Sequence, residues 1–248
     1  MWFRNGGMLT GDEIERQIRK GNIIIDPFDP DHINPNSYNL CLHPQILIYS
    51  RNGDRSCELP TGEIDPVKDF INREHARLDI EKKEEYIPLR KLSPNATISA
   101  SMSTFLSVER FNEARLSDLD LHPIDMMEKN ETISFNIPET GYVLRPGVLY
   151  IGRTEERTFT EKYIPMLDGR SSGGRLGISV HICAGFGDVG FDGTWTLEIT
   201  VVEPVIVYPH TQIAQVSYFK PCGKIGRKYE GRYFGQIDAT ASRFYRKV

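Results

Sequence analysis

A segment rich in glycine, serine and arginine is the first place where residue types and spacing could do chemistry. It spans residues 168–177 and contains Arg170, Ser171, Ser172 and Arg175. Glycines let a ligand approach the backbone, hydroxyl and N–H groups donate hydrogen bonds, and arginine supplies bidentate charge-assisted bonds. The segment therefore fits either an anion cradle or a structural turn. It lacks the G-x-x-x-x-G-K-[ST] pattern, so it is not a P-loop.

A second glycine-rich segment, residues 184–193, places Asp188 among glycines. An aspartate in such a sequence often bonds its own backbone in a β-turn. The same carboxylate could instead meet a ribose hydroxyl or a water molecule. The pattern alone leaves both interpretations open.

Glu198 lies within an apolar segment, residues 194–202. In a strand, Trp195, Leu197 and Ile199 would share one face and Glu198 would lie on the other. One interpretation is a carboxylate that faces solvent. The other is a general base that lines a pocket.

The elements that would position these residues are mostly strands. A single helix is expected at residues 9–21, where Thr10 and Glu13 make a capping box and Gly21 can end the helix. Short strands with glycine and proline between them indicate an all-β barrel or sandwich. Alternating or β-branched runs predict strands at residues 23–25, 38–42, 132–137, 142–144, 148–151, 194–202, 205–208 and 212–219.

Residues 51–90 differ in character, because eighteen of these forty residues are Asp, Glu, Lys or Arg. Within them, residues 65–78 have the spacing of an amphipathic helix. The segment is interpreted either as a solvated surface insertion or as a partner-binding or regulatory element.

Composition bounds the function further. The chain has 248 residues, 39% hydrophobic residues and a net charge of −4, which is typical of a soluble globular protein and does not indicate a binder of duplex nucleic acid. No apolar run approaches the length of a membrane span. The four cysteines are far apart and form no C-x-x-C pair, so we expect a reducing, cytoplasmic location. They are Cys41, Cys57, Cys183 and Cys222.

Taken together, the segments resemble the dCTP deaminase branch of the trimeric dUTPase superfamily. The resemblance implies a mainly β fold, a distorted, jelly-roll-like β-barrel with a few short helices. It also implies a single domain over residues 1–248, with a charged insertion at about residues 51–130. The similar stretches, in order, are Pro35 to Leu40, Gly169 to Ser172 with Arg175 to Gly177, Ala184 to Gly193, Leu197-Glu198 and Ile213 to Gln215, with a weaker match at Lys228 to Gly231 and Ala241 to Arg243.

The resemblance also implies roles for individual residues. Glu198 would take a proton from water and pass one to the departing ammonia, while Arg175 and Ser171 would hold the base, the water and Glu198 in position. Asp188 would meet the sugar 3′-hydroxyl. The other implied substrate-binding residues are Arg170, Ser172, His181, Ala184, Gln215, Lys228, Tyr229 and Gln236.

The implied partners are a dCTP- or dUTP-type nucleotide, Mg²⁺ bound through the triphosphate, and two further copies of the chain in a homotrimer. Zinc-dependent nucleobase deaminases carry H-x-E with P-C-x-x-C. None of the six histidines is followed by x-Glu, and Pro221-Cys222 has no second cysteine three residues on. The expected deamination is therefore independent of zinc.

Four functions follow from this pattern. The main expectation is deamination of dCTP to dUTP and ammonia. The alternative is a bifunctional enzyme that forms dUMP and pyrophosphate, and Ala184-Gly185-Phe186 resembles bifunctional members. A dUTPase without deaminase activity is disfavoured by Glu198, and a non-catalytic nucleotide-binding regulator is disfavoured by Glu198, Ser171 and Arg175.

Overall fold

A computed structural model describes residues 6–50 and 124–246 of the chain. Every strand pair in this part of the chain is antiparallel. The elements are β1 (Gly7–Met8), α1 (Gly11–Arg19), β2 (Ile23–Asp26), η1 (Pro30–His32), β3 (Tyr38–Cys41), β4 (Gln45–Tyr49), β5 (Thr132–Asn136), β6 (Tyr142–Leu144), β7 (Tyr150–Thr160), β8 (Ile164–Gly169), α5 (Ser171–Arg175), β9 (Ile178–Ser179), β10 (Asp192–Val201), β11 (Val205–Val207) and β12 (Gln212–Lys220).

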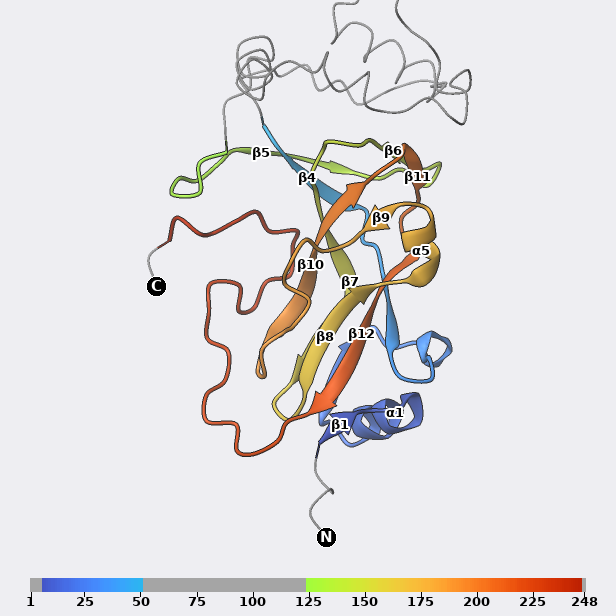
Figure 1. Cartoon of the computed structure of the whole chain (residues 1–248), viewed down its shortest axis with the longest axis vertical. Helices are drawn as coiled ribbons and strands as arrows, with labels where there is room; N and C mark the ends of the chain where they lie inside the picture. Colours follow the sequence, from blue (N-terminus) through green and yellow to red (C-terminus); the bar gives the residue numbers. More distant parts are fainter. Residues whose placement is uncertain (1–5, 51–123, 247–248) are drawn as a thin grey trace, which may run out of the picture. The chain divides into compact units, whose positions relative to one another are not determined.

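The strands form two larger sheets and a small ribbon (Figure 1). In the four-stranded sheet, β12 pairs with β1, β3 and β8. The six-stranded sheet has the order β5-β4-β7-β10-β9, and β2 also pairs with β7. The ribbon consists of β6 and β11. The described residues thus confirm a mainly β fold with a few short helices.

Side chains from both larger sheets meet in one hydrophobic core. Leu40 of β3, Leu197 and Ile199 of β10, and Val216 and Tyr218 of β12 are completely buried there. Burying such side chains stabilises the fold by about 1.5–3 kcal/mol each relative to exposure. Because Leu197 and Ile199 are fixed in this core, the residue between them on β10 must point to the opposite face of the sheet.

The predicted first helix is confirmed as α1. Thr10 caps it, since its side-chain oxygen accepts a hydrogen bond from the Glu13 N–H at 3.4 Å. The reciprocal half of the capping box is replaced by an ion pair, because the Glu13 carboxylate accepts from the Arg16 guanidinium. Gly21 follows with a φ of +69°, a left-handed conformation that favours glycine.

All eight predicted strands are present, but β1, β4, β8, β9 and most of β7 were not predicted. The inward residues of β7 include Thr154, Glu156 and Thr158, all buried, so its sequence lacks a simple apolar alternation. The segment at residues 168–177, interpreted as either an anion cradle or a structural turn, contains a helical turn that neither interpretation included. Ser171–Arg175 forms the short helix α5, directly after β8.

The predicted helix at residues 65–78 lies outside the described residues, as does most of the predicted insertion. The single-domain interpretation with that insertion therefore stays a prediction. Among the described helices the longest, α1, has nine residues, whereas a membrane span needs about 20.

Candidate active site

A cavity of about 550 Å³ lies beside β10 and contains Glu198 in its lining. As predicted, Leu197 and Ile199 are buried on one side of this strand and Glu198 is partly buried on the other. Trp195, predicted to share the face of Leu197, instead lines the same cavity as Glu198. The Glu198 N–H donates to the Val180 carbonyl at 2.9 Å, which fixes β10 beside the loop that follows β9. The carboxylate thus lines a cavity rather than facing open solvent.

The loop after β9 holds the Glu198 carboxylate. The Ile182 backbone N–H donates to Glu198 Oε2 at 2.9 Å. No hydrogen bond to Oε1 is found among the described residues, so this oxygen is available to a ligand or a water in the cavity. Cys183 and Ala184, which follow Ile182, also line the cavity.

Glycines let the same loop lie close to β8 and β10. The Leu167 N–H donates to the Gly185 carbonyl at 2.7 Å, and the Gly187 N–H donates to the Pro165 carbonyl at 2.9 Å. A Cβ at Gly187 would lie 2.2 Å from Cη2 of Trp195, so a larger residue would displace the indole ring. The glycines therefore bring Asp188, which also lines the cavity, next to β10.

An irregularity in β10 aims two successive residues at the cavity. The register between β10 and β7 shifts between Thr194 and Thr196. A β-bulge of this kind re-aims side chains that strict alternation would send to opposite faces. Consequently both Trp195 and Thr196 line the cavity. The Trp195 indole N–H donates to Thr158 Oγ1 at 2.9 Å, which fixes the ring.

Aromatic rings form much of the cavity wall. Phe191 contacts Trp195 with ring centroids 5.1 Å apart and meets Tyr229 edge-on at 5.8 Å. Phe186 and Tyr233 also line the cavity. Aromatic faces beside a few polar groups suit a flat, polar heterocycle such as a nucleobase.

The chain after β12 forms the other side of the cavity. Figure 1 shows this segment running alongside β10. Gln236 lies buried there, and its Nε2 donates to the Thr194 carbonyl at 2.8 Å and to Thr196 Oγ1 at 3.1 Å. Its Oε1 is buried and has no hydrogen-bond partner among residues 6–50 and 124–246. This oxygen is an acceptor that a donor group of a ligand in the cavity could satisfy.

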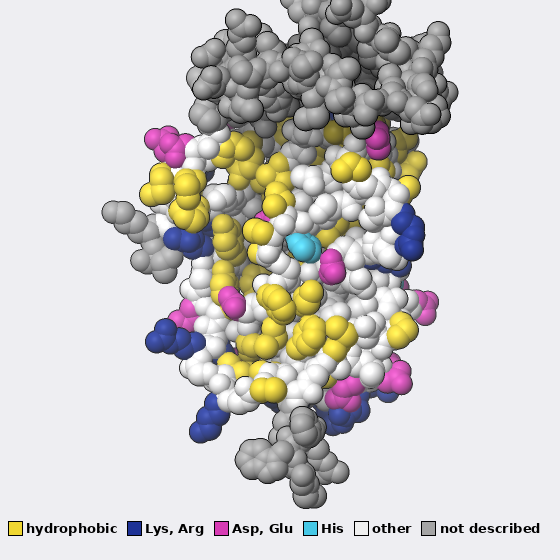
Figure 2. All heavy atoms as spheres, in the orientation of Figure 1, with side chains coloured by type: hydrophobic (Ala, Val, Ile, Leu, Met, Phe, Trp, Pro, Cys, Tyr) yellow, Lys and Arg dark blue, Asp and Glu magenta, His cyan; other side chains and the backbone are white. Residues whose placement is uncertain are grey.

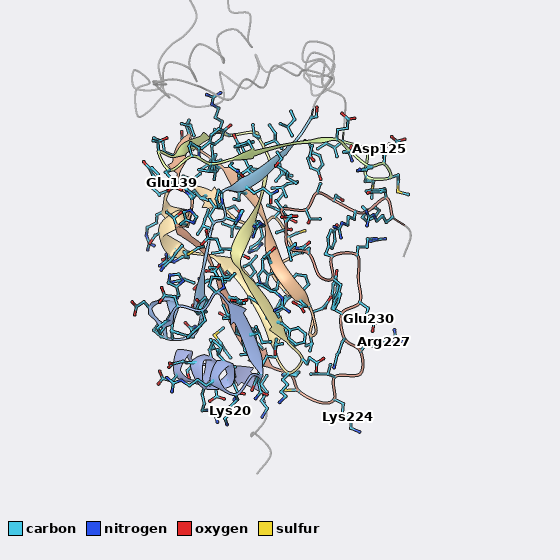
Figure 3. All side chains as sticks on the ribbon, turned by 180° about the vertical axis from the view of Figure 1, so that it is seen from behind. Lys20, Asp125, Glu139, Lys224, Arg227 and Glu230 are labelled. Atoms are coloured by element: carbon cyan, nitrogen blue, oxygen red, sulfur yellow. The ribbon has the colours of Figure 1, made fainter. Side chains whose placement is uncertain are left out.

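A smaller hollow of about 480 Å³ adjoins the cavity and shares Phe186, Gly187, Asp188 and Tyr229 with it. Lys228 and Arg227 add positive charge to its lining. Lys228 Nζ is 2.6 Å from Glu161 Oε1. Figure 3 shows Lys224, Arg227 and Glu230 spaced along this tail at the margin of the body.

The predicted site residues fall into two groups. Glu198, Ala184, Asp188, Tyr229 and Gln236 line the main cavity, and Lys228 lies in the adjoining hollow. The residues at α5 form a second group that does not line the cavity in this chain: Arg170, Ser171, Ser172 and Arg175.

The α5 group is held in place by the neighbouring strands. Arg170 Nη1 donates to the Gln212 carbonyl at 3.0 Å, and Arg175 Nη1 donates to the Ser171 carbonyl at 3.0 Å. Gln215 supports the start of α5, because its Nε2 donates to the Gly169 carbonyl at 2.9 Å. Its Oε1 accepts from Ser37 Oγ at 2.8 Å, so both ends of this side chain are engaged within the chain.

His181 lies between the two groups in sequence and is outside the cavity lining. Its Nε2 is 3.4 Å from Asp168 Oδ1, which joins the loop after β9 to the end of β8. Its Nδ1 is buried and unpartnered within the described part of the chain. His181 therefore contacts the end of β8 and does not line the cavity, whereas the three residues that follow it, Ile182 to Ala184, do.

Sequence reasoning missed several cavity residues, among them Tyr49, Ile151 and Tyr233. Tyr49 comes from β4 and Ile151 from β7, and their pairing with distant segments is not visible in the sequence. Tyr233 did carry a signal, since it is an aromatic residue in a glycine-rich, charged tail.

Comparisons with known proteins identify the family of this chain. The family model for dCTP deaminase-like proteins matches residues 8–88 and 71–221. A "dCTP deaminase, dUMP-forming" from Clostridium beijerinckii is 36% identical over 239 residues, which cover 96% of this chain and 97% of that relative. Another of the same description, from Hathewaya histolytica, is 34% identical over 91% of this chain and 90% of that relative.

A solved structure of a 2′-deoxycytidine 5′-triphosphate deaminase from Agrobacterium tumefaciens is 18% identical, with a TM-score of 0.46, and the match covers 88% of this chain and 49% of that one. The fold and the cavity define a mainly antiparallel β protein with one aromatic-lined cavity beside β10. From the family-model match and the extended sequence identity, the chain belongs to the dCTP deaminase-like family.

Proposed function

We propose that this chain hydrolyses dCTP to dUMP, ammonia and pyrophosphate. The carrying observation is the Glu198 carboxylate, held through one oxygen by the Ile182 N–H inside an aromatic cavity. The sequence pattern favoured dUTP as the product. The curated relatives, which align over nearly their whole length, are described as dUMP-forming, and this favours the bifunctional alternative.

In the deamination step, a water attacks C4 of the cytosine while Glu198 takes its proton. The tetrahedral centre then loses its amino group as ammonia after Glu198 returns a proton to that nitrogen. A positioned carboxylate contributes typically 10²–10⁴-fold to such a step. The buried Oε1 of Gln236 would accept a hydrogen bond from the bound nucleotide.

In the second step, a water displaces pyrophosphate from the α-phosphorus, which leaves dUMP. Asp188 lines both the cavity and the adjoining hollow, so its carboxylate would orient this water. Lys228 and Arg227 line the hollow and would meet phosphate charge there. Mg²⁺ prefers phosphate oxygens and water as ligands, so it would arrive bound to the triphosphate.

We further infer that the complete site forms between subunits of a homotrimer. The α5 group does not line the Glu198 cavity of its own chain, and a neighbouring copy would supply it. Next to α5, Leu176 and Val202 are 60% and 74% exposed, an apolar surface that an interface would cover. Figure 2 shows hydrophobic side chains gathered in the middle of one face, with basic ones mainly at its margins.

The reaction would take place in the cytoplasm. The described cysteines, Cys41, Cys183 and Cys222, are all free, as a reducing compartment favours.

The direct test is product analysis with the full chain, dCTP and Mg²⁺. Ammonia, pyrophosphate, dUMP and dUTP are quantified together, and a parallel reaction starts from dUTP. We expect ammonia and dUMP in equal amounts. Ammonia with accumulating dUTP would show that the reaction stops at deamination, and cleavage of dUTP with dCTP untouched would show a plain dUTPase. Binding of dCTP without any product would leave only a nucleotide-binding regulator.

A further inference from the structure

A second group of reactive side chains lies away from the Glu198 cavity. His32 of η1, Cys41 of β3 and Glu156 of β7 bring a ring nitrogen, a sulfur and a carboxylate oxygen within 4.8 Å of one another. None of the three lines the main cavity or the adjoining hollow. The mechanism proposed above does not use them, so their convergence needs another explanation.

The Glu156 carboxylate is unusual for its burial. Its side chain is 3% exposed and points inward from the central strand of the six-stranded sheet. Both carboxylate oxygens face the same Cys41 backbone N–H, at 2.9 Å for Oε2 and 3.2 Å for Oε1. No lysine or arginine of the described residues forms an ion pair with it. A buried carboxylate that accepts so few hydrogen bonds and has no paired charge is stable only if it is protonated or lies beside a cation.

His32 points an unused nitrogen at that carboxylate. Its Nδ1 lies 3.9 Å from Glu156 Oε1, is buried, and makes no hydrogen bond within residues 6–50 and 124–246. The other ring nitrogen, Nε2, faces Asp29 Oδ2 at 3.8 Å. In metal-binding histidines a carboxylate commonly accepts the N–H of the nitrogen that does not bind the metal. Asp29 lies on the correct side of His32 for this role, and a small shift would bring its carboxylate within hydrogen-bond distance of Nε2.

We infer that His32 Nδ1, Cys41 Sγ and Glu156 form a binding site for a thiophilic divalent transition-metal ion, zinc above all. Sulfur and imidazole donors select such ions over Mg²⁺ or Ca²⁺. A thiolate and a carboxylate together would neutralise a 2+ ion, which removes the cost of unpaired buried charge. Tetrahedral zinc holds its ligand atoms roughly 3.5 Å apart, so a small inward movement of these side chains would close the site.

The ion would be structural. It would join η1 and β3 to β7, which lies more than a hundred residues further along the chain. It would take no part in the removal of the amino group at Glu198. The His32 side chain is 15% exposed, so an ion can enter from its side.

Cobalt provides the test, because it reports a thiolate ligand directly. The full-length chain, stripped with a chelator, is titrated with CoCl₂ and its absorption is recorded. We expect a saturable thiolate-to-cobalt charge-transfer band that ZnCl₂ displaces. Cys41→Ser should abolish the band, whereas Cys222→Ser, which changes an exposed free cysteine, should keep it. No band in the wild type, or an unchanged band in Cys41→Ser, would overturn the site.

Two further variants keep the test decisive if Cys41→Ser does not fold. Asp29→Asn keeps a side-chain oxygen that can cap η1 but removes the negative charge beside His32. We therefore expect roughly 10–100-fold weaker cobalt binding. Asp31→Asn, an exposed neighbour, is the matched control and should bind as the wild type does. His32→Gln should also lose the rise in melting temperature that ZnCl₂ gives the wild type. Equal cobalt affinities for Asp29→Asn and Asp31→Asn, or an unchanged zinc effect in His32→Gln, would refute the assignment.

Discussion

At the scale of single residues, the proposed chemistry separates two carboxylates by their surroundings. Glu198 stands on a strand and has one oxygen bound to the Ile182 N–H. Asp188 stands in a glycine-rich loop at the junction of the cavity and the adjoining hollow. Glu198 would act on the cytosine ring and Asp188 on the triphosphate. Variants of the two residues should therefore block different steps of the reaction.

Asp188→Asn tests this division. We expect it to keep ammonia release from dCTP while pyrophosphate release falls by roughly 10²–10⁴-fold, because the second water loses its orienting base. The measurement is the ratio of pyrophosphate to ammonia together with dUTP accumulation.

Asp192→Asn, at the start of β10, is the control. The Asp192 carboxylate is already paired with Arg157, with Nη2 at 2.6 Å from Oδ2, so its variant should leave the ratio unchanged. A parallel loss of ammonia and pyrophosphate in Asp188→Asn would contradict the separate roles.

At the scale of elements, the cavity depends on the close approach of the loop at Gly187 to β10. Gly187→Ala would place a Cβ 2.2 Å from the Trp195 ring. We expect a loss of about 1–3 kcal/mol in unfolding free energy, typical of overpacking, and weaker nucleotide binding because the ring moves into the cavity. Denaturant unfolding and calorimetric titration with dCTP measure the two effects.

Gly226→Ala is the matched control, since nothing lies within 4 Å of a Cβ built at Gly226. It should change neither quantity by more than about 0.5 kcal/mol. If Gly187→Ala behaves in the same way, the cavity wall is more adaptable than its geometry indicates.

The turn before β4 should make stability sensitive to acid. Burial and the Arg153 charge lower the pKa of His43 below its ordinary value of 6.5, and Nδ1 accepts the Gln45 N–H at 3.1 Å. The folded state thus favours the neutral ring, while the unfolded chain takes up a proton below about pH 6.5. Stability from this group is present above pH 6.5 and is lost as the pH falls below that value.

His43→Gln keeps an acceptor for Gln45 but does not titrate. Urea unfolding at pH 7.5 and pH 5.5 should therefore show a smaller loss of stability on acidification in this variant than in the wild type. An identical loss in both proteins would show that His43 does not contribute.

The elements also show what the sequence could and could not predict. The helix cap at Thr10 and the alternation around Glu198 are local patterns, and both were recovered. β7 was underestimated because its inward residues are threonine and glutamate, whose burial depends on partners in β2, β4 and β10. Tyr49 and Tyr233 join the cavity from segments almost two hundred residues apart, which no local pattern encodes.

At the scale of the whole molecule, a homotrimer would resolve the separation of the two site groups. Glu198→Gln and Arg175→Ala chains, each inactive alone, should regain activity when co-expressed, since a mixed trimer contains some sites with both intact groups. Random mixing around a three-fold axis predicts about a quarter of wild-type activity. Ser171→Ala mixed with Arg175→Ala, both in α5, should regain none. Absence of recovery in the first mixture would place both groups in one chain's site.

The most direct test of the central claim is ammonia release from dCTP by Glu198→Gln, with dCTP affinity measured on the same preparation. Glu203→Gln, an exposed glutamate beyond the end of β10, is the matched control and should behave as the wild type does. We predict that Glu198→Gln binds dCTP nearly as well as the wild type but releases ammonia roughly 10²–10⁴-fold more slowly, as expected for a lost general base. Ammonia release near the wild-type rate would contradict the role of Glu198 and, with it, this account of the site.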